Sequence, residues 1–317
     1  MVAAAARRVV RGVGLLVLFG LAISYGIALL LSAPDQETIG APPRDLDAHE
    51  VSFASGSGAT IHGWLIEGRP HRGAVLLLHG VHANRLAMLP RARFLSAAGY
   101  AVLLIDFQAH GESIGRKITF GVLESRDAQA ALAYLREKAP GERIGVVGVS
   151  MGGAAALLAE PPLAADAFVL EQVYPTVDEA LDNRLRLYLG SSGALAAPLL
   201  RIEMSWHLGL DPAQLRPIDR IGRLHASMFV IAGDADRHTT LAQSRALFAA
   251  ANEPKQLWIV PGAAHVDLHA RVGAEYERRV LAFLERTLRA GAAQDTARSI
   301  PSRAASTMTS ISSGVMQ

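Results

Sequence analysis

The chain has 317 residues, half of them hydrophobic, a formal net charge of +2 and no cysteine. Its length and hydrophobic content allow one large α/β domain or two small ones, and they exclude disorder over most of the chain. The lack of cysteine excludes thiol catalysis, disulfides and cysteine-based zinc sites. Because no basic patch with interleaved aromatic residues is present, nucleic acid is a poor candidate partner.

The first predicted element is a membrane-spanning helix. Val13–Leu31 carries no charge and would rise roughly 28 Å as a helix, close to the thickness of the hydrocarbon core. The flanking charges are asymmetric, with basic residues before the segment and acidic residues after it: Arg7, Arg8 and Arg11, then Asp35 and Glu37. The positive-inside rule therefore predicts a single-pass protein of the cytoplasmic membrane, with its N-terminus in the cytoplasm and its main domain exported.

A cleaved signal peptide is the rival interpretation of this segment and would make the protein secreted. Signal peptides normally have a shorter apolar core, and Pro34 directly follows the candidate cleavage site. The uncleaved anchor (residues 1–33) is therefore the preferred prediction, followed by a proline-containing linker over 34–47.

The folded domain is predicted over 48–289 and begins with a hairpin. His49–Ala54 and Ala59–Glu67 flank a turn-like Ser-Gly-Ser-Gly sequence, which predicts two antiparallel strands. The runs that follow are mostly apolar throughout, as expected of parallel strands buried on both faces: Ala74–His79, Ala101–Asp106, Arg143–Val149, Ala167–Gln172, Ser227–Ala232 and Gln256–Val260.

Helical patterns separate these strands. A helix is predicted over Val122–Lys138, where apolar residues recur at i, i+3, i+4 and i+7 before Pro140 and Gly141, and another around Tyr276–Leu288. The order predicts the α/β class: a mostly parallel eight-stranded sheet with an antiparallel first hairpin and helices on both faces.

Two regions depart from this alternation. About 174–224 contains no clear strand but many leucines, which predicts two or three helices over the sheet, interpreted as a lid. The segment 290–317 is rich in alanine, serine and threonine and is predicted to be a disordered tail.

Ser150 is the candidate nucleophile. It lies between a predicted strand and a predicted helix, flanked by Gly148 and Gly152. Such a sharp turn raises a serine at the carboxyl edge of the sheet, and a Cβ at either glycine would clash across it. A serine that only caps the helix would explain the hydroxyl but not the two glycines.

A serine nucleophile needs a base and a group that orients the base. Asp236 and His265 follow the last two predicted strands, in the chain order Ser, Asp, His that is associated with this elbow. His238 and His269 are the alternative bases. A metal site on His265 and His269 lacks an evident third ligand.

The oxyanion of the reaction needs hydrogen-bond donors. The backbone N–H groups of Met151, at the start of the helix, and Val81, in the loop after the third strand, are placed to supply them. His79 and Gly80 are expected to shape that loop.

These features resemble the α/β-hydrolase superfamily, and within it membrane-anchored or secreted bacterial serine hydrolases with a short helical lid. The resemblance covers about residues 49–288 and depends on these segments: LLLHG (76–80), LLIDFQAHGES (103–113), TFGVLESRDAQAAL (119–132), VVGVSMGG (146–153), GDAD (233–236) and AAHVDLH (263–269). It implies that Asp236 is the acidic triad member and Asp234 a turn residue. Gln108 and Ala109 replace an arginine and a glycine that are common in the family, while Asp106 and His110 are expected to be structural.

The predicted function is that of a serine hydrolase that cleaves a carboxylic ester or related acyl bond, with no cofactor or metal implied. An acyltransferase, thioesterase or peptidase with the same triad, or a noncatalytic membrane-anchored binding module, are the alternatives. The expected partners are a small ester or acyl substrate and the membrane; the leucines and Trp206 of the lid suggest an apolar substrate group, although the lid's own core could need them.

Overall fold

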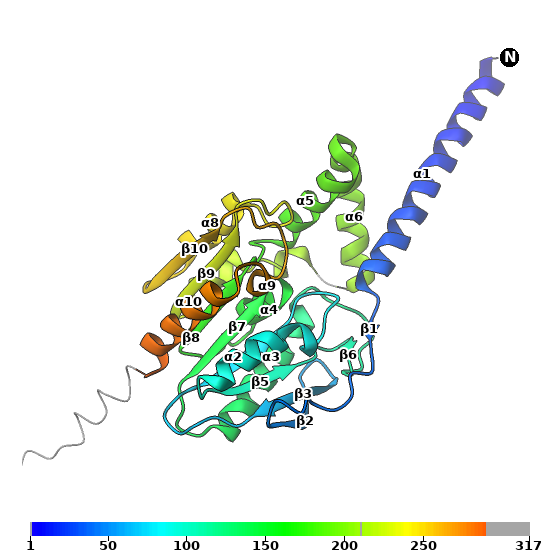
Figure 1. Ribbon diagram of the computed structural model, residues 1–317. Helices are drawn as coiled ribbons and strands as arrows, with labels where there is room; N and C mark the ends of the chain where they lie inside the picture. The colour runs from blue at the N-terminus through cyan, green and yellow to red at the C-terminus, as the bar shows by residue number, and fades with distance from the viewer. Residues whose placement is uncertain (1, 210, 290–317) are drawn as a thin grey trace, which may run out of the picture.

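The computed structural model describes residues 2–209 and 211–289. It contains an eight-stranded sheet in the order β10-β9-β8-β7-β4-β5-β3-β2 (Figure 1). β3 is antiparallel to β2 and β5, and the other neighbours are parallel. The strands are β2 (Ala48–Ala54), β3 (Thr60–Ile66), β4 (Ala74–Leu78), β5 (Ala101–Ile105), β7 (Ile144–Val149), β8 (Ala167–Glu171), β9 (Ser227–Gly233) and β10 (Lys255–Val260). The predicted sheet and its first hairpin are confirmed.

Helices cover both faces of the sheet because its central strands are apolar throughout. One face packs on α3 (Val122–Lys138), α4 (Met151–Leu158), α7 (Ile218–Ile221) and α8 (Leu241–Ala250). The other face packs on α2 (Leu89–Ala97), α9 (Leu268–Val272) and α10 (Ala274–Leu284), which continues into a π-helical turn at Glu285–Arg289. In β4, Leu76 belongs to the first core and Leu77 to the second, as the two-residue period of a strand requires.

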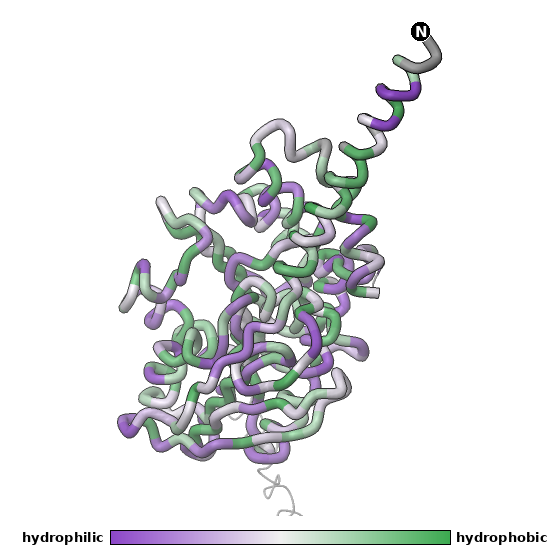
Figure 2. Tube along the Cα trace, turned by 90° about the vertical axis from the view of Figure 1, so that its right-hand side faces the viewer, coloured by the Kyte–Doolittle hydropathy of each residue, from purple (hydrophilic) through white to green (hydrophobic). Residues whose placement is uncertain are grey.

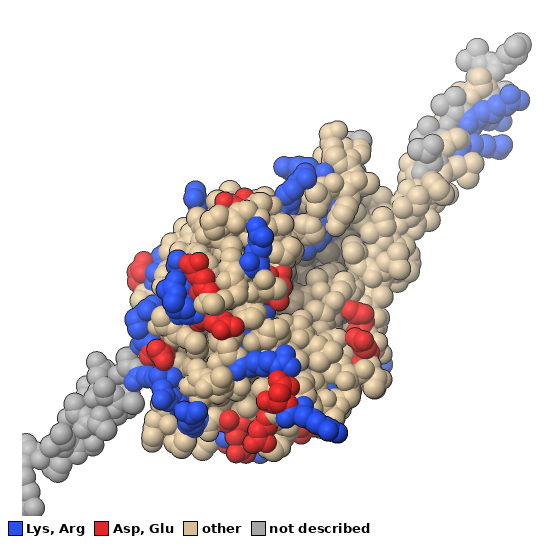
Figure 3. Space-filling model, in the orientation of Figure 1, with Lys and Arg blue, Asp and Glu red and all other residues tan. Residues whose placement is uncertain are grey.

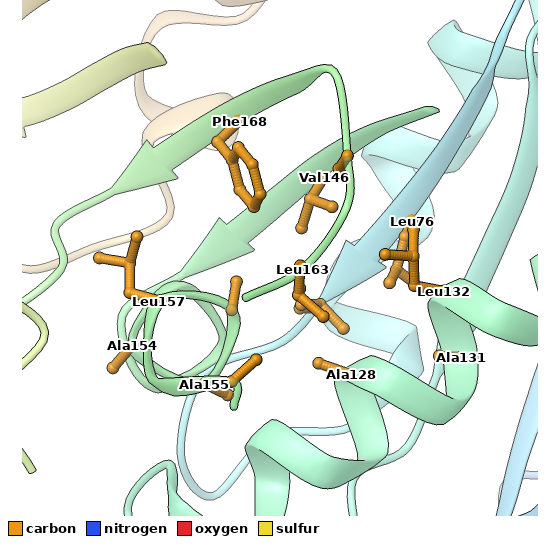
Figure 4. Packing of buried hydrophobic residues seen from close by; sticks show 14 of the residues in the cluster. Leu76, Ala128, Ala131, Leu132, Val146, Ala154, Ala155, Leu157, Leu163 and Phe168 are labelled. Atoms are coloured by element: carbon orange, nitrogen blue, oxygen red, sulfur yellow. The ribbon is translucent and has the colours of Figure 1, made fainter. Parts of the chain in front are cut away.

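α3 and α4 pack closely against one face of the sheet, and this packing fixes the position of α4 relative to the strands (Figure 4). Leu76, Val146 and Phe168 come from three adjacent strands and lie in register. They face small residues of the helices, among them Ala128 on α3 and Ala155 on α4. Alanines let both helices approach the sheet closely, and α4 begins two residues after β7 ends, so Ser150 alone makes the turn between them.

The region predicted as a lid is helical. It contains α5 (Val177–Leu189), α6 (Gly193–Leu208), α7 and short 3-10 turns at Gly190–Ser192 and Pro212–Gln214. α5 and α6 pack against each other and project from the carboxyl edge of the sheet (Figure 1). The predicted helices are present, and their movement as a lid stays a prediction.

The N-terminal helix α1 (Val2–Ser32) is long and apolar enough to cross a membrane over Ala5–Ser32. Figure 2 shows hydrophilic residues near its N-terminus and hydrophobic residues toward its base. A signal sequence near the N-terminus can meet the same criteria of length and hydropathy, so α1 by itself is weak support for an anchor.

The segment predicted as a linker is partly ordered against the domain. β1 (Asp35–Gln36) pairs in parallel with β6 (His110–Gly111), a contact that the sequence did not indicate. The predicted disordered tail, 290–317, lies outside the described residues.

Candidate active site

Ser150 occupies a strained turn between β7 and α4. Its backbone has φ +48° and ψ −112°, a conformation that a residue with a side chain rarely adopts. Its N–H donates to the Glu171 carbonyl at 2.8 Å, which ties the turn to β8. The side chain is buried except for its approach to the cavities described below. The structure therefore has a strained strand–turn–helix at Ser150, as a nucleophile elbow requires, and the role of Ser150 as a nucleophile stays a prediction.

The glycines around Ser150 are required by contacts between backbone segments. A Cβ on Gly148 would lie 2.6 Å from the Cα of Gly153, and a Cβ on Gly152 would lie 2.3 Å from the carbonyl oxygen of Leu78. No flexible side chain is available to yield at either place. Both glycines thus permit the tight turn, as expected for an elbow.

The structure brings Ser150, His265 and Asp236 together. Nε2 of His265 lies 3.3 Å from Oγ of Ser150, and Nδ1 of His265 lies 2.7 Å from Oδ2 of Asp236. Asp236 follows β9 and His265 follows β10, so both side chains reach the same sheet edge as the serine. The first distance is longer than a typical O–H···N bond but lies in the range seen before substrate binds.

Four donors fix the orientation of the Asp236 carboxylate. Oδ1 accepts from the N–H groups of His238 at 2.8 Å and Thr239 at 2.9 Å. Oδ2 accepts from His265 and from Nε2 of Gln172 at 3.2 Å. Because each oxygen has its own donors, the carboxylate cannot rotate without losing hydrogen bonds.

Gln172 is a residue of this site that the sequence analysis missed. It follows β8 directly and has a positive φ of 51°. Besides Asp236, its Nε2 also donates to the carbonyl of Ala264 at 2.6 Å, one residue before His265. One amide therefore holds both the acid and the chain that carries the base. The positive φ, which depends on tertiary structure, is not visible in the sequence.

A buried ion pair supports the loop of His265 from behind. Arg91 on α2 donates to both carboxylate oxygens of Glu171, at 2.9 and 2.7 Å, and to Asp267 at 2.8 Å. The hydroxyl of Tyr276 also donates to Glu171. Since Arg91 and Glu171 are almost fully buried, this network fixes the relative positions of β8, α2 and the chain after His265.

The loop after β4 is shaped by a neutral histidine. Nδ1 of His79 donates to the carbonyl of Gly80 at 2.7 Å, and its Nε2 accepts from the N–H of Phe107 at 3.1 Å. Burial, and then the neighbouring His110, lower the pKa of His79 to about 3. The neutral ring therefore holds the turn in which Gly80 and Val81 lie, as predicted.

Two cavities meet at Ser150. The first is mainly apolar and is lined by Val81, Met151 and residues of α1, α5 and α6. The second is lined by Gly80, Val81, Gln172, His265 and their neighbours. Met151 is the first residue of α4, so its N–H has no acceptor within the helix.

Arg184 on α5 borders both cavities. Its Nη1 donates to the carbonyl of Ala180 at 3.0 Å, and within the described residues no carboxylate lies within 4.0 Å of it. Burial lowers the pKa of its guanidinium. The site thus contains a cation without a salt-bridge partner in the part of the chain that is described.

The other polar candidates have structural partners. His238 stacks on His265 with ring centroids 5.2 Å apart, while His269 lies 2.9 Å from Glu277. Asp234 accepts from the N–H of Gly262 at 2.6 Å and is a turn residue, as the resemblance implied. Over residues 2–209 and 211–289, no group of histidines and carboxylates could hold a metal ion.

Asp106 and His110 have the structural roles that were expected of them. Asp106 is buried against Nη1 of Arg85 at 2.7 Å, and the ring of His110 packs edge-on against His79. Gln108, at the position where the family commonly has an arginine, donates to Glu124 at 2.7 Å and to the carbonyl of Lys117 at 2.8 Å. This departure from the family pattern therefore changes the scaffold rather than the Ser150 site.

Comparisons with known proteins agree with this architecture. Residues 69–172 match the family model described as serine aminopeptidase, S33. An uncharacterized protein of Mycobacterium tuberculosis is 31% identical over 245 residues, which cover 73% of this chain and 78% of the relative. The α/β hydrolase domain-containing protein WAV2 of Arabidopsis thaliana is 27% identical over 305 residues, 92% of this chain and 95% of that protein.

Among solved structures, an esterase of Pyrococcus furiosus has a similar fold, with a TM-score of 0.68 and 24% identity over 81% of this chain and 98% of that one. The matching family model, the relatives and the solved structure all agree with the family resemblance of the sequence. The chain therefore belongs to the α/β-hydrolase superfamily.

Proposed function

We propose that the protein is a serine hydrolase that cleaves carboxylic esters or related acyl bonds with Ser150, His265 and Asp236. The observation that carries this proposal is the continuous path from the Ser150 hydroxyl through both ring nitrogens of His265 to the Asp236 carboxylate. Such a path lets the imidazole take the serine proton while the carboxylate stabilises the resulting charge.

In the proposed reaction, Ser150 Oγ attacks the acyl carbon as its proton passes to Nε2 of His265. The N–H groups of Val81 and Met151 hold the oxyanion, and each such donor typically contributes about 3 to 4 kcal/mol. The leaving alcohol takes the proton from His265. A water molecule, deprotonated by the same histidine, then releases the acid and restores the serine.

The charges at the site favour an ester over the N-terminal peptide bond that the family description suggests. An aminopeptidase must bind a protonated amine, which calls for a carboxylate in the pocket. Among the described residues, the only carboxylate lining either cavity is Asp267, and Arg91 already binds it. Arg184 would repel the amine. An ester substrate carries no such cation.

We also propose that α1 anchors the enzyme in the cytoplasmic membrane, with the hydrolase domain outside the cytoplasm. The uncharged helix and the basic residues before it support this topology. When reporters are fused to the C-terminus, one that works only outside the cytoplasm should be active and one that works only in the cytoplasm should be inactive. The reverse result would contradict the topology.

The hydrolase proposal is tested with the full chain in detergent micelles and p-nitrophenyl butyrate. Ser150→Ala should reduce the rate to background. The matched control is Ser125→Ala, because Ser125 is equally buried but lies on α3. Leucine p-nitroanilide should not be cleaved, and added alcohol should leave the free acid as the main product. Equal rates for wild type and Ser150→Ala would overturn the proposal, and a dominant transfer product would indicate an acyltransferase.

A further inference from the structure

The last turns of α1 form part of the wall of the apolar cavity that opens onto Ser150. Ala28, Leu31 and Ser32 line it on one side, and Met151 lines it beside the serine. The three α1 residues are spaced i, i+3 and i+4, so they share one face of the helix. The helix that is apolar enough to span a membrane thus borders the space next to the candidate nucleophile.

Hydrogen bonds hold this end of α1 against the domain. Nε2 of His207, on α6, lies 3.0 Å from Oγ of Ser32, and the N–H of Ile118 donates to the Ser32 carbonyl at 2.8 Å. Nζ of Lys117, the residue before Ile118, donates to the carbonyls of His207 and Leu208 at 3.0 and 2.6 Å. The loop that binds the end of α1 is therefore also bound to α6. The pairing of β1 with β6 continues this attachment. α1 is therefore fixed as a wall of the cavity and is not a loose tether.

The surface of α6 near α1 is also suited to a membrane. Trp206 is 84% exposed and Ile202, one turn earlier, is 65% exposed. Such side chains are unfavourable in water, whereas tryptophan is enriched where a bilayer meets water. Figure 3 shows no charged side chain on the lower half of α1, and basic side chains only toward its N-terminus.

The depth of the cavity follows from the charges on α1. The helix is uncharged from Gly12 to Ser32, and this part rises about 32 Å, which matches a hydrocarbon core of roughly 30 Å. If Arg11 lies at one boundary, then Ala28–Ser32 occupies the last ~6 Å before the other. The cavity then opens where the ester groups of membrane lipids lie, between the hydrocarbon and the headgroups.

We propose that the substrate is an acyl ester held in the bilayer, whose chain passes along α1 into this cavity while its ester group reaches Ser150. This inference rests on the proposed hydrolase function. The cavity of about 150 Å³ is comparable with an apolar cavity that binds benzene. It therefore holds the methylenes next to the ester and leaves the rest of the chain in the bilayer. Ser150 Oγ takes the acyl group while its proton passes through His265 to the leaving alcohol, and water then releases the fatty acid and restores the serine hydroxyl.

The first test compares the same substitution at neighbouring positions of α1. Leu31 lines the cavity and is 41% exposed, so a larger side chain can enter without disrupting the helix; Leu30 is 74% exposed and does not line it. The full chain is placed in phosphatidylcholine vesicles with p-nitrophenyl dodecanoate or acetate. Leu31→Trp should lower the ratio of kcat/KM for dodecanoate to that for acetate by about 4-fold to 16-fold, because excluding one or two methylenes from the cavity costs roughly fourfold each. Leu30→Trp should leave both rates unchanged.

A second pair of variants guards against an effect peculiar to tryptophan. Ala28→Phe narrows the cavity, and Ala22→Phe makes the same change at an exposed position of α1. Only Ala28→Phe should lower the ratio. Acetate hydrolysis with an unchanged ratio in both cavity variants would overturn the inference and leave the hydrolase proposal standing. Failure of the folded wild type on both esters would overturn both.

The route from the bilayer is tested by where the ester is placed. p-Nitrophenyl palmitate is incorporated either into the vesicles that contain the protein or into separate vesicles. Hydrolysis should be fast only in the first case, whereas soluble p-nitrophenyl acetate should react equally in both. Equal rates for palmitate in the two arrangements would show that the ester arrives through water and would contradict the proposal.

Discussion

Replacement of Asp236 by asparagine should inactivate the enzyme by forcing the wrong tautomer on His265. Oδ1 of Asp236 accepts from two backbone N–H groups, those of His238 and Thr239, so the amide oxygen of asparagine must take that place. The amide NH2 then replaces Oδ2 and faces the donors Nδ1 of His265 and Nε2 of Gln172. The histidine avoids this conflict only by moving its proton to Nε2.

With its proton on Nε2, His265 cannot accept the proton of Ser150. The same change of tautomer in a Ser–His–Asp triad lowers kcat by about 10⁴-fold, equivalent to about 5 kcal/mol in the barrier. The side chains have nearly the same volume, and only the contact of two NH2 groups at Gln172 is new. We therefore expect a small loss of stability beside a large loss of rate.

The assay is kcat/KM of the full chain for p-nitrophenyl butyrate in detergent micelles, together with Tm. Asp234→Asn is the matched control, since Asp234 accepts one backbone N–H that an amide oxygen can accept equally well. It should keep the wild-type rate within about twofold, as expected of a surface substitution. An Asp236→Asn variant with more than a tenth of the wild-type rate would refute the assigned role of Asp236.

Three further predictions concern the scaffold. Gly148→Ala should abolish activity and lower Tm, because its Cβ would lie 2.6 Å from the backbone of Gly153. Gly56→Ala, where the nearest contact is 3.6 Å, is the control, and an active Gly148→Ala would contradict the elbow argument. Arg91→Met should lower the free energy of unfolding in urea by about 3 to 5 kcal/mol, because it leaves buried Glu171 without its cation; a loss below about 1 kcal/mol would show that the pair is not needed. The pKa of His79 is lowered to about 3, so below pH 6.5 the unfolded chain binds a proton at this residue that the folded chain does not. The free energy of unfolding should therefore decrease as the pH is lowered, by up to about 1.4 kcal/mol per pH unit. In urea titrations at pH 7 and 5, His79→Gln should lose less unfolding free energy between the two pH values than wild type. Equal losses in the two proteins would contradict this role of His79.

The sequence predicted those parts of the molecule that depend on local pattern. The apolar runs of β4 and β5 are buried on both faces because helices cover both sides of the sheet, so their composition alone identifies them. Ser150, Asp236 and His265 could be proposed together because Ser150 directly follows β7 and the other two lie in the loops after β9 and β10, and parallel strands end at one sheet edge.

The remainder depends on contacts between distant segments. Gln172 reaches Asp236 only because β8 and β9 are neighbours in the sheet. The part of α1 in the cavity wall arises from its packing on α6, some 175 positions away, through the contact of Ser32 with His207. Neither residue type carries a signal of its own, because glutamine and serine are common at surfaces and in helices.

The activated state of Ser150 is tested most directly by intact-protein mass spectrometry of the full chain after treatment with a fluorophosphonate. Wild type should gain one adduct, and folded Ser150→Ala and His265→Ala variants should gain none. His238→Ala, which removes only the ring stacked on His265 and keeps the backbone N–H to Asp236, should still be labelled. A folded wild type without an adduct, or an adduct that persists in Ser150→Ala, would contradict the assignment of Ser150 as the nucleophile.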